Sequence, residues 1–158
     1  MKIIVVDDEP DVQFLFKQRF RREIRKEEIE FNFFLSAGEV IDYLSTTDNI
    51  DIVLILSDIN MPGMNGLELL KIIKEKTPEQ KVFMITAYSD EHNYKTAVEY
   101  GADDYLTKPL DFSGLKAKLM WIHRKGNIPN LLSPFLKTVS QSLIRTYLFS
   151  SGNGLRIS

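Results

Sequence analysis

Residues 53–66 have the sequence VLILSDINMPGMNG, in which an apolar run stops at one carboxylate, Asp58, and continues into a loop rich in proline and glycine. The uninterrupted apolar run predicts a strand that is buried on both faces of a parallel sheet. Asp58 would then lie at the carboxyl end of this strand, which is the edge where open α/β sheets bind their ligands. The stretch therefore predicts both a fold class and the position of a site.

A second apolar strand, KIIVV at residues 2–6, also ends in acids, because Asp7, Asp8 and Glu9 follow it. Carboxylates brought together at one edge would repel one another and raise their own pKa values unless a cation neutralised them. The chain has no cysteine, and its two histidines lie elsewhere in the sequence. Oxygen ligands alone favour Mg²⁺ over Zn²⁺ or copper.

Length and composition suit one globular domain, with 158 residues of which 44% are hydrophobic and 27% charged. No apolar run reaches the roughly 18 residues of a membrane span, and no signal peptide is evident, so we expect a cytoplasmic protein without a membrane partner. Residues 1–123 hold all 22 acids and 15 of the 20 bases. The five remaining bases are too scattered to indicate a nucleic-acid surface.

The order of the predicted elements alternates between strand and helix along the first 124 residues. We expect strands at residues 2–6, 29–35, 51–57, 81–85 and 103–106, and helices at residues 11–27, 37–46, 66–76, 90–100 and 111–124. Five such units with short connections predict an α/β fold, a doubly wound parallel sheet of five strands in the order 2-1-3-4-5. That order makes the first and third strands neighbours and places their terminal acids together.

Four motifs at these strand ends resemble the receiver domain of two-component response regulators: VVDDEP, SDINMPGMNG, ITAYS and DDYLTKPL, in that order. The resemblance covers residues 1 to about 123, and the domain is expected to span residues 1–125. Helix 111–124 has Ser113 and Gly114 where receivers of transcription factors often have an acid. The resemblance implies a flavodoxin-like fold and phosphorylation of Asp58 by a histidine kinase or phosphotransfer protein. The domain would be a signalling phosphoacceptor that catalyses only its own phosphorylation and dephosphorylation.

The same resemblance assigns roles to the residues around Asp58. Mg²⁺ would be bound by Asp8, Asp58 and the backbone carbonyl of Asn60, and Asp7 would hold a metal-bound water. The other implied site residues are the switch hydroxyl, the switch aromatic and the ammonium that pairs with the phosphoryl group: Thr86, Tyr105 and Lys108. Pro109 matches a position that follows a cis peptide bond in the family.

Signal output would follow from the charge of the phosphoryl group, whose oxygens Thr86 reaches only by moving with its loop. The vacated space would admit the Tyr105 ring. The surface expected to change comprises helix 90–100, strand 103–106 and helix 111–124, which is also one possible surface for a homodimer.

Residues 126–158 begin with a linker, after which apolar residues recur at helical intervals from Leu132 to Tyr147. The pattern predicts an amphipathic helix that needs an apolar surface to lie on. It is interpreted either as a dimerising helix or as the truncated start of an output region.

Two other functions fit parts of the sequence. A phosphohydrolase of the haloacid-dehalogenase type also forms an aspartyl phosphate, but it would have its nucleophile in a DxD pair after the first strand. A flavodoxin-type FMN binder would have a loop rich in Ser, Thr and Gly there. The segment Glu9, Pro10, Asp11 is acidic instead and would repel a phosphate.

Overall fold

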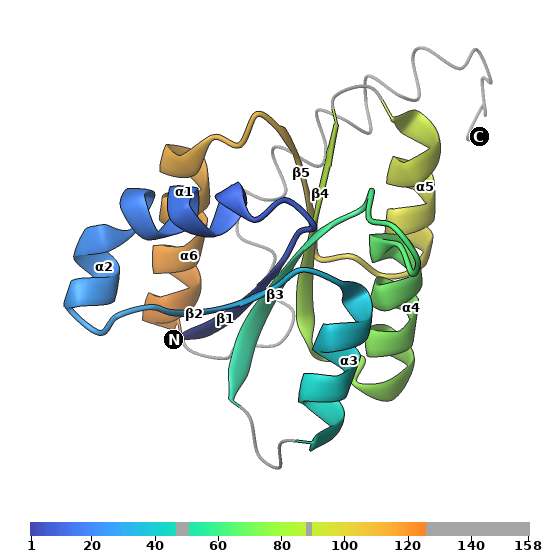
Figure 1. The fold of residues 1–158 in the computed structure, drawn as a ribbon, viewed down its shortest axis with the longest axis horizontal. Helices are drawn as coiled ribbons and strands as arrows, with labels where there is room; N and C mark the ends of the chain where they lie inside the picture. The colour runs from blue at the N-terminus through green and yellow to red at the C-terminus, as the bar shows by residue number, and fades with distance from the viewer. Residues whose placement is uncertain (47–50, 88–89, 126–158) are drawn as a thin grey trace, which may run out of the picture. The chain divides into compact units, whose positions relative to one another are not determined.

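Five parallel strands in the order β2-β1-β3-β4-β5 form a single sheet in the computed structural model (Figure 1). The structure describes residues 1–46, 51–87 and 90–125. In chain order the strands are β1 (Lys2–Val6), β2 (Glu30–Phe34), β3 (Ile52–Asp58), β4 (Lys81–Ala87) and β5 (Asp104–Lys108). The predicted fold class and strand order are confirmed.

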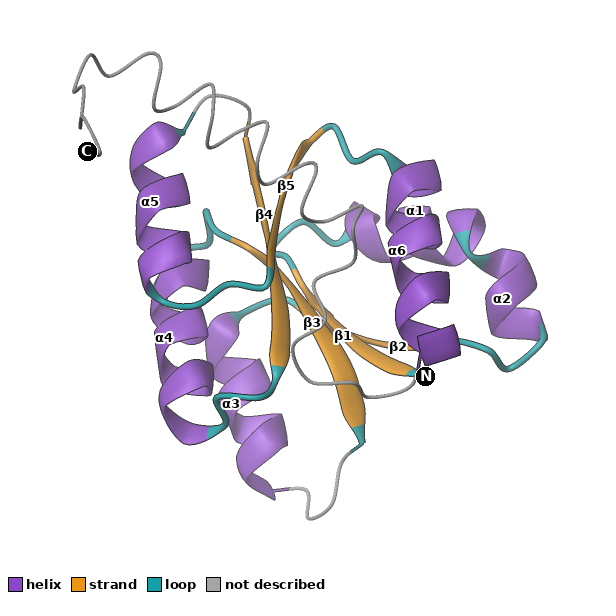
Figure 2. Ribbon diagram, turned by 180° about the vertical axis from the view of Figure 1, so that it is seen from behind, coloured by secondary structure: helices purple, strands orange, loops and turns teal. Residues whose placement is uncertain are grey.

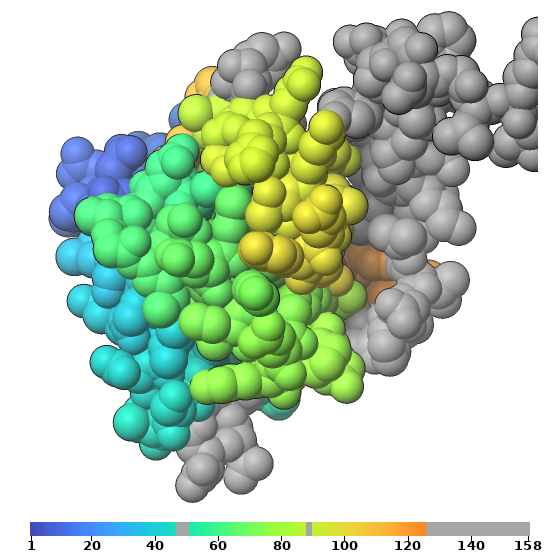
Figure 3. All heavy atoms as spheres, turned by 90° about the vertical axis from the view of Figure 1, so that its right-hand side faces the viewer, coloured from blue at the N-terminus to red at the C-terminus, as the bar shows by residue number. Residues whose placement is uncertain are grey.

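Helices cover both faces of the sheet (Figure 2). Within the described residues they are α1 (Asp11–Arg19), α2 (Arg21–Arg25), α3 (Ala37–Thr46), α4 (Gly66–Lys76), α5 (Glu91–Glu99) and α6 (Phe112–Lys125). One face is covered by α1, α2 and α6 and the other by α3, α4 and α5, in agreement with the two separate apolar clusters. Figure 3 looks onto the second face, where α3, α4 and α5 run from cyan to yellow.

The buried strands supply side chains to both clusters because successive residues of a strand point to opposite faces. Ile3 and Val5 of β1 pack in the same cluster as Phe16 of α1, whereas Ile4 and Val6 belong to the cluster under α3 and α4. All four strand residues are almost fully buried. The apolar runs that predicted a parallel sheet are thus explained by helices on both sides of it.

The prediction of one helix over residues 11–27 is wrong, because the chain leaves helical geometry at Phe20 and separates α1 from α2. Phe20 has φ −102° and ψ 17°, while its N–H still donates to the Phe16 carbonyl at 2.9 Å. The buried rings of Phe16 and Phe20 stack with their centroids 5.9 Å apart. Their four-residue spacing is compatible with a continuous helix, so it does not reveal the bend.

The strand register aligns the functional ends of the strands. Val6 pairs with Ser57 across β1 and β3, and Asp58 pairs with Ile85 across β3 and β4. Thr86 pairs with Thr107 of β5. The residues that end these strands or follow them therefore meet at one edge of the sheet.

The predicted amphipathic segment in residues 126–158 and the domain boundary beside it lie outside the described residues. None of the helices in the described part of the chain is both long enough and apolar enough to cross a membrane.

Candidate functional site

Asp7 and Asp8 follow β1, Asp58 is the last residue of β3, and one carboxylate oxygen from each lies within 4.8 Å of the other two. The Asp7 and Asp58 residues are only 5% and 3% exposed, whereas Asp8 is more accessible. The backbone N–H of Glu9 donates to Asp7 Oδ1 at 2.9 Å and fixes that carboxylate. The sequence predicted this group of acids, and the structure brings them together.

Lys108, the last residue of β5, is the cation that faces this group. Its Nζ lies 3.2 Å from Asp7 Oδ2, 3.4 Å from Asp58 Oδ1 and 3.8 Å from Glu9 Oε1. The following peptide bond, Lys108–Pro109, is cis, as the resemblance implied. One ammonium thus stands against several carboxylates, so the site retains an excess of negative charge.

Burial and this excess of negative charge both affect the pKa values of Asp58 and Lys108. Burial, together with the charge of Asp7, raises the pKa of Asp58 to about 6, although Lys108 partly opposes the rise. Burial acts to lower the pKa of Lys108, but attraction to Asp58 and Asp7 outweighs it, so the pKa is raised and the ammonium stays charged. Asp58 is therefore a carboxylate whose ionised form is poorly compensated by the protein alone.

These residues fit a small divalent cation. Mg²⁺ prefers carboxylate and carbonyl oxygens as ligands. The three carboxylate oxygens lie within 4.8 Å of one another, so these side chains would hold the ion between them. The unneutralised charge at Asp58 supplies the electrostatic reason for binding a cation there.

Gly66 holds the loop after β3 against the end of that strand. A Cβ at this position would lie 2.0 Å from the backbone oxygen of Asp58, so no other residue fits without displacing the backbone. The Gly66 N–H donates to the Ile59 carbonyl at 2.9 Å, and α4 begins at Gly66 itself. The Asn65 side chain accepts from the Glu68 N–H, and Glu68 in turn accepts from the Asn65 N–H, both at 2.9 Å.

Thr86 and Tyr105 lie next to the carboxylates on the β4 and β5 side. Thr86 is fully buried, and its hydroxyl has no hydrogen-bond partner among the described residues. The half-buried Tyr105 ring packs edge-on against Tyr94, and its hydroxyl donates to the Asp90 carbonyl at 3.4 Å. Burial raises the pKa of Tyr105, and the nearby Thr86 hydroxyl partly counters this although the two groups fall short of hydrogen-bond geometry.

The predicted site residues thus lie at one edge of the sheet, and the metal-binding role of Asn60, which is exposed, stays a prediction. Glu9, which the sequence placed among the acids after the first strand, is the outermost acid that faces Lys108. One contributor was not singled out from the sequence. Asp90 caps α5 by accepting from the Asn93 N–H, and its carbonyl receives the Tyr105 hydroxyl. The cap was detectable as an acid directly before a helical pattern, but its contact with Tyr105 was not.

The acidic pocket opposite a lysine lies at the carboxyl edge of a five-stranded doubly wound sheet, which is where α/β domains of this class bind their ligands. The sequence matches the response regulator receiver domain over residues 3–120, and the chain belongs to that family. It is a signalling domain of two-component systems, whose members interact with histidine kinases or phosphotransfer proteins. The matched family is the first of the three functions weighed from the sequence.

Similar proteins differ in how much of their length the chain spans. A CheY homologue, a chemotaxis protein of Campylobacter jejuni, is 31% identical over 121 residues, which is 75% of this chain and 89% of that protein. The DNA-binding transcriptional regulator NtrC of Proteus hauseri is 35% identical over 142 residues, 88% of this chain. The chain spans just 28% of the length of that regulator.

A solved structure with a ligand also matches. It is the response regulator TrrA of Thermotoga maritima in complex with Mg²⁺ and BeF, 31% identical with a TM-score of 0.61. The match covers 77% of this chain and 97% of TrrA.

Proposed function

We propose that Asp58 accepts a phosphoryl group from a phosphohistidine of a histidine kinase or phosphotransfer protein, in a reaction that requires Mg²⁺. The observation that supports this most directly is the joint placement of three carboxylates and one ammonium at the end of β3. Asp58 is the buried member of this group whose charge is least compensated, and Lys108 lies within 3.4 Å of it.

In the transfer, an ionised oxygen of Asp58 forms a bond to phosphorus while the bond from phosphorus to the donor imidazole nitrogen breaks. The imidazole keeps the electron pair of that bond, and an acyl phosphate remains on Asp58. The transition state is loose and highly charged, so positively charged groups placed around it account for most of the catalysis. Lys108 provides such a group from the β5 side.

The residues that would hold Mg²⁺ are Asp7, Asp8, Asp58 and, through its backbone carbonyl, Asn60. When bound, the ion supplies positive charge that offsets the repulsion between these carboxylates and the incoming phosphoryl oxygens. Lys108 remains paired with Asp7 at 3.2 Å, which keeps its ammonium directed at the site.

The output would pass through Thr86 and Tyr105. A buried hydroxyl without a partner is available to a phosphoryl oxygen, and the bond would draw Thr86 toward Asp58. Tyr105 would then repack, and its contacts with Tyr94 and with the Asp90 carbonyl connect that change to α5. The surface altered by phosphorylation would be made by α5, β5 and α6. The domain would catalyse only its own phosphorylation and dephosphorylation.

A surface for the phosphodonor lies beside the site. Three of the large apolar side chains that are exposed come from α1 and from the residue that follows β2: Phe14 (72% exposed), Leu15 (39%) and Leu35 (50%). A cavity of about 280 Å³ is lined by Asp7, Val12 and Leu35 among others, so it runs from the carboxylates toward this apolar surface. An apolar helix of the donor placed here would bring its phosphohistidine to Asp58.

The test is covalent labelling by a small acyl phosphate in the presence of Mg²⁺, followed by intact-protein mass spectrometry. We expect one phosphoryl group per chain, lost in the Asp58→Asn variant and in excess chelator. The matched control is Asp42→Asn, which changes an exposed acid on α3. Labelling of the Asp58→Asn variant at the parent rate, or labelling that ignores the chelator, would contradict the proposal.

A further inference from the structure

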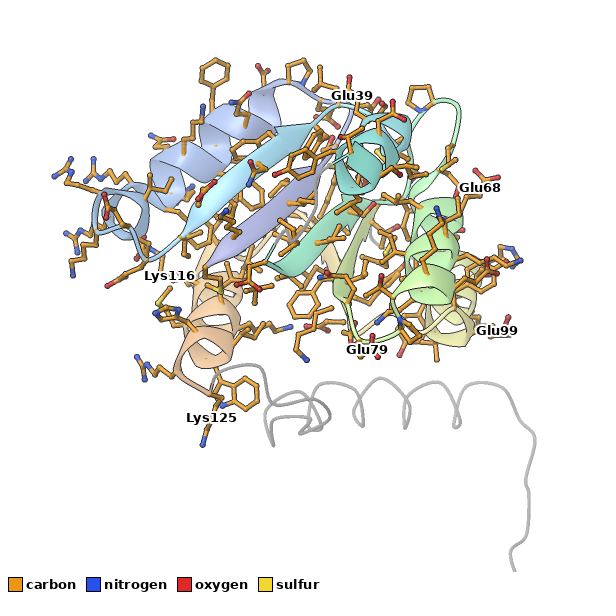
Figure 4. The ribbon with its side chains drawn as sticks, turned by 90° about the horizontal axis from the view of Figure 1, so that it is seen from below. Glu39, Glu68, Glu79, Glu99, Lys116 and Lys125 are labelled. Atoms are coloured by element: carbon orange, nitrogen blue, oxygen red, sulfur yellow. The ribbon has the colours of Figure 1, made fainter. Side chains whose placement is uncertain are left out.

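The outer edge of the sheet is open at β2. Within the described residues β2 is hydrogen-bonded to β1 alone, and it lies at the edge with α1 to one side and α3 to the other (Figure 4). The Glu30 N–H donates to the Met1 carbonyl, and the Phe34 carbonyl accepts from Asp7. Because backbone groups alternate in direction along a strand, the N–H and carbonyl groups of Phe31 and Phe33 point outward. An open edge of this kind is a template for one more strand.

A groove runs beside this edge. Its volume is about 690 Å³, and its walls include Lys17, Arg21 and Arg25 from α1 and α2 together with Phe31 and Phe33 from β2. The side chains of Phe31 and Phe33 face the cluster under α1 and α6, which is the same side of the sheet as the groove. Every second side chain of an added strand would therefore enter the groove, while its backbone paired with β2.

The charge of the groove selects the kind of strand. Lys17, Arg21 and Arg25 are exposed, and none of them forms an ion pair within the described residues. Glu27 and Glu30 also line the groove, but they stand near the start of β2. Lys17 lies 5.8 Å from the centre of the Phe33 ring, toward the other end of the strand. An acidic side chain entering the groove opposite Phe33 would meet the Lys17 ammonium, and Arg21 and Arg25 line the same groove.

Two occupants are disfavoured by the same charges. A second copy paired through its own β2 edge would bring another set of Lys17, Arg21 and Arg25 to the contact. Residues 124–158 of this chain contain five bases and no acid, so they lack the complementary charge.

We propose that the β2 edge and the groove under α1 and α2 form a docking site for an extended acidic peptide segment of a partner protein. The segment adds to the sheet as a sixth strand through Phe31 and Phe33 and places alternate acidic side chains against Lys17, Arg21 and Arg25. The site is separate from the carboxylate pocket, so its occupation does not depend on phosphorylation of Asp58.

The probe is a fluorescent peptide of alternating glutamate and valine, about eight residues long, which is the length of a long strand. Hydrogen exchange of the protein amides, followed by NMR, reports the pairing directly. We expect exchange at the Phe31 and Phe33 amides to slow at least about tenfold when the peptide saturates the protein. The same peptide methylated on every backbone nitrogen retains its charge but loses its donors, and we expect it to bind at least about tenfold more weakly.

Charge-reversal variants distinguish binding of the probe in the groove from non-specific binding to exposed basic residues. Lys17→Glu combined with Arg21→Glu should weaken binding of the probe about tenfold or more in a fluorescence titration. The matched control combines Arg22→Glu with Lys26→Glu, which makes the same charge change at exposed residues of the same segment that do not line the groove. We expect the control to lose no more than about twofold, the part due to long-range charge.

Several outcomes would overturn the proposal. Unchanged exchange at Phe31 and Phe33 under saturating peptide would rule out strand addition, and this measurement needs no variant. Equal loss in the groove variant and its control would reduce the effect to non-specific charge. Tighter binding of a DNA duplex or of phosphatidylserine vesicles than of the probe, with competition between them, would assign the surface to another class of anion.

Discussion

The amino and carboxyl edges of the sheet each hold a partly buried lysine against an aspartate, and they differ in how completely the charges are matched. At the amino edge Lys74 Nζ lies 2.7 Å from Asp103 Oδ2 and also donates to the carbonyls of Pro78 and Gln80. Asp103 accepts the Val82 N–H as well. At the carboxyl edge, Lys108 alone faces several acids. The charges at the amino edge are paired with one another and hold β4 and β5 together, whereas the carboxyl edge keeps an excess of negative charge.

The largest expected effect on stability comes from removing the negative charge of Asp58. In chelator, Asp58→Asn should raise the free energy of unfolding at pH 7 by about 3 kcal/mol, the equivalent of raising the Asp58 pKa from 3.8 to about 6. The folded parent binds this proton more tightly than the unfolded chain does. Its stability therefore falls as the pH rises between those two values, and the penalty is fully present above about 6.

Urea unfolding of the parent and the Asp58→Asn variant from pH 4 to pH 7 measures this difference. Saturating Mg²⁺ should narrow it, because the ion binds the folded parent. Parallel stability curves for the two proteins in chelator would show that Asp58 is not electrostatically frustrated.

Removing a charge at the amino edge, where Lys74 and Asp103 are paired, should lower the free energy of unfolding. Lys74→Met keeps the length of the side chain but leaves the Asp103 carboxylate without its cation, which should cost about 2 kcal/mol because Asp103 is partly exposed. Mg²⁺ should not restore the loss. The control is Lys76→Met, at an exposed residue of the same helix, and urea unfolding with and without Mg²⁺ is the measurement. Recovery of stability with Mg²⁺ would mean that the two edges are not independent.

The smallest effect concerns the hydroxyl without a partner. Thr86→Val replaces a buried hydroxyl by a methyl group of similar size and should raise the free energy of unfolding by about 1 kcal/mol. Thr107→Val, at the exposed residue that pairs with Thr86 in β5, should change it little. A destabilised Thr86→Val variant would show that the hydroxyl has a partner in solution.

The carboxyl edge was predictable because each strand ends in a local signal. An apolar run followed by an acid locates Asp7 and Asp58 on their strands, and the alternation of elements then gives the strand order that joins them. The amino edge carries no such signal. Lys74 and Asp103 are 29 residues apart in sequence and lie among many other charges, so only the folded chain identifies them as partners.

Two local features of the fold also differ from what the sequence predicted. Phe20 interrupts the first helix without a glycine or proline. Its place in the aromatic cluster fits the spacing of an unbroken helix, so the sequence pattern does not reveal the break. β4 was predicted to end at Ile85 but continues to Ala87, since Thr86 and Ala87 pair with the end of β5. Such pairing is a tertiary effect that overrides the local pattern.

The absence of a side chain at Gly66 lets the start of α4 approach the end of β3 closely. The backbone at the start of α4 lies directly against the end of β3 at this residue, so we expect the loop between them to shift little. On the other flank of Asp58, Thr86 has an unsatisfied hydroxyl and Tyr105 a long hydrogen bond. We therefore expect the receiver to change on one side of Asp58 only: the start of α4 stays in place, and the structure moves toward α5.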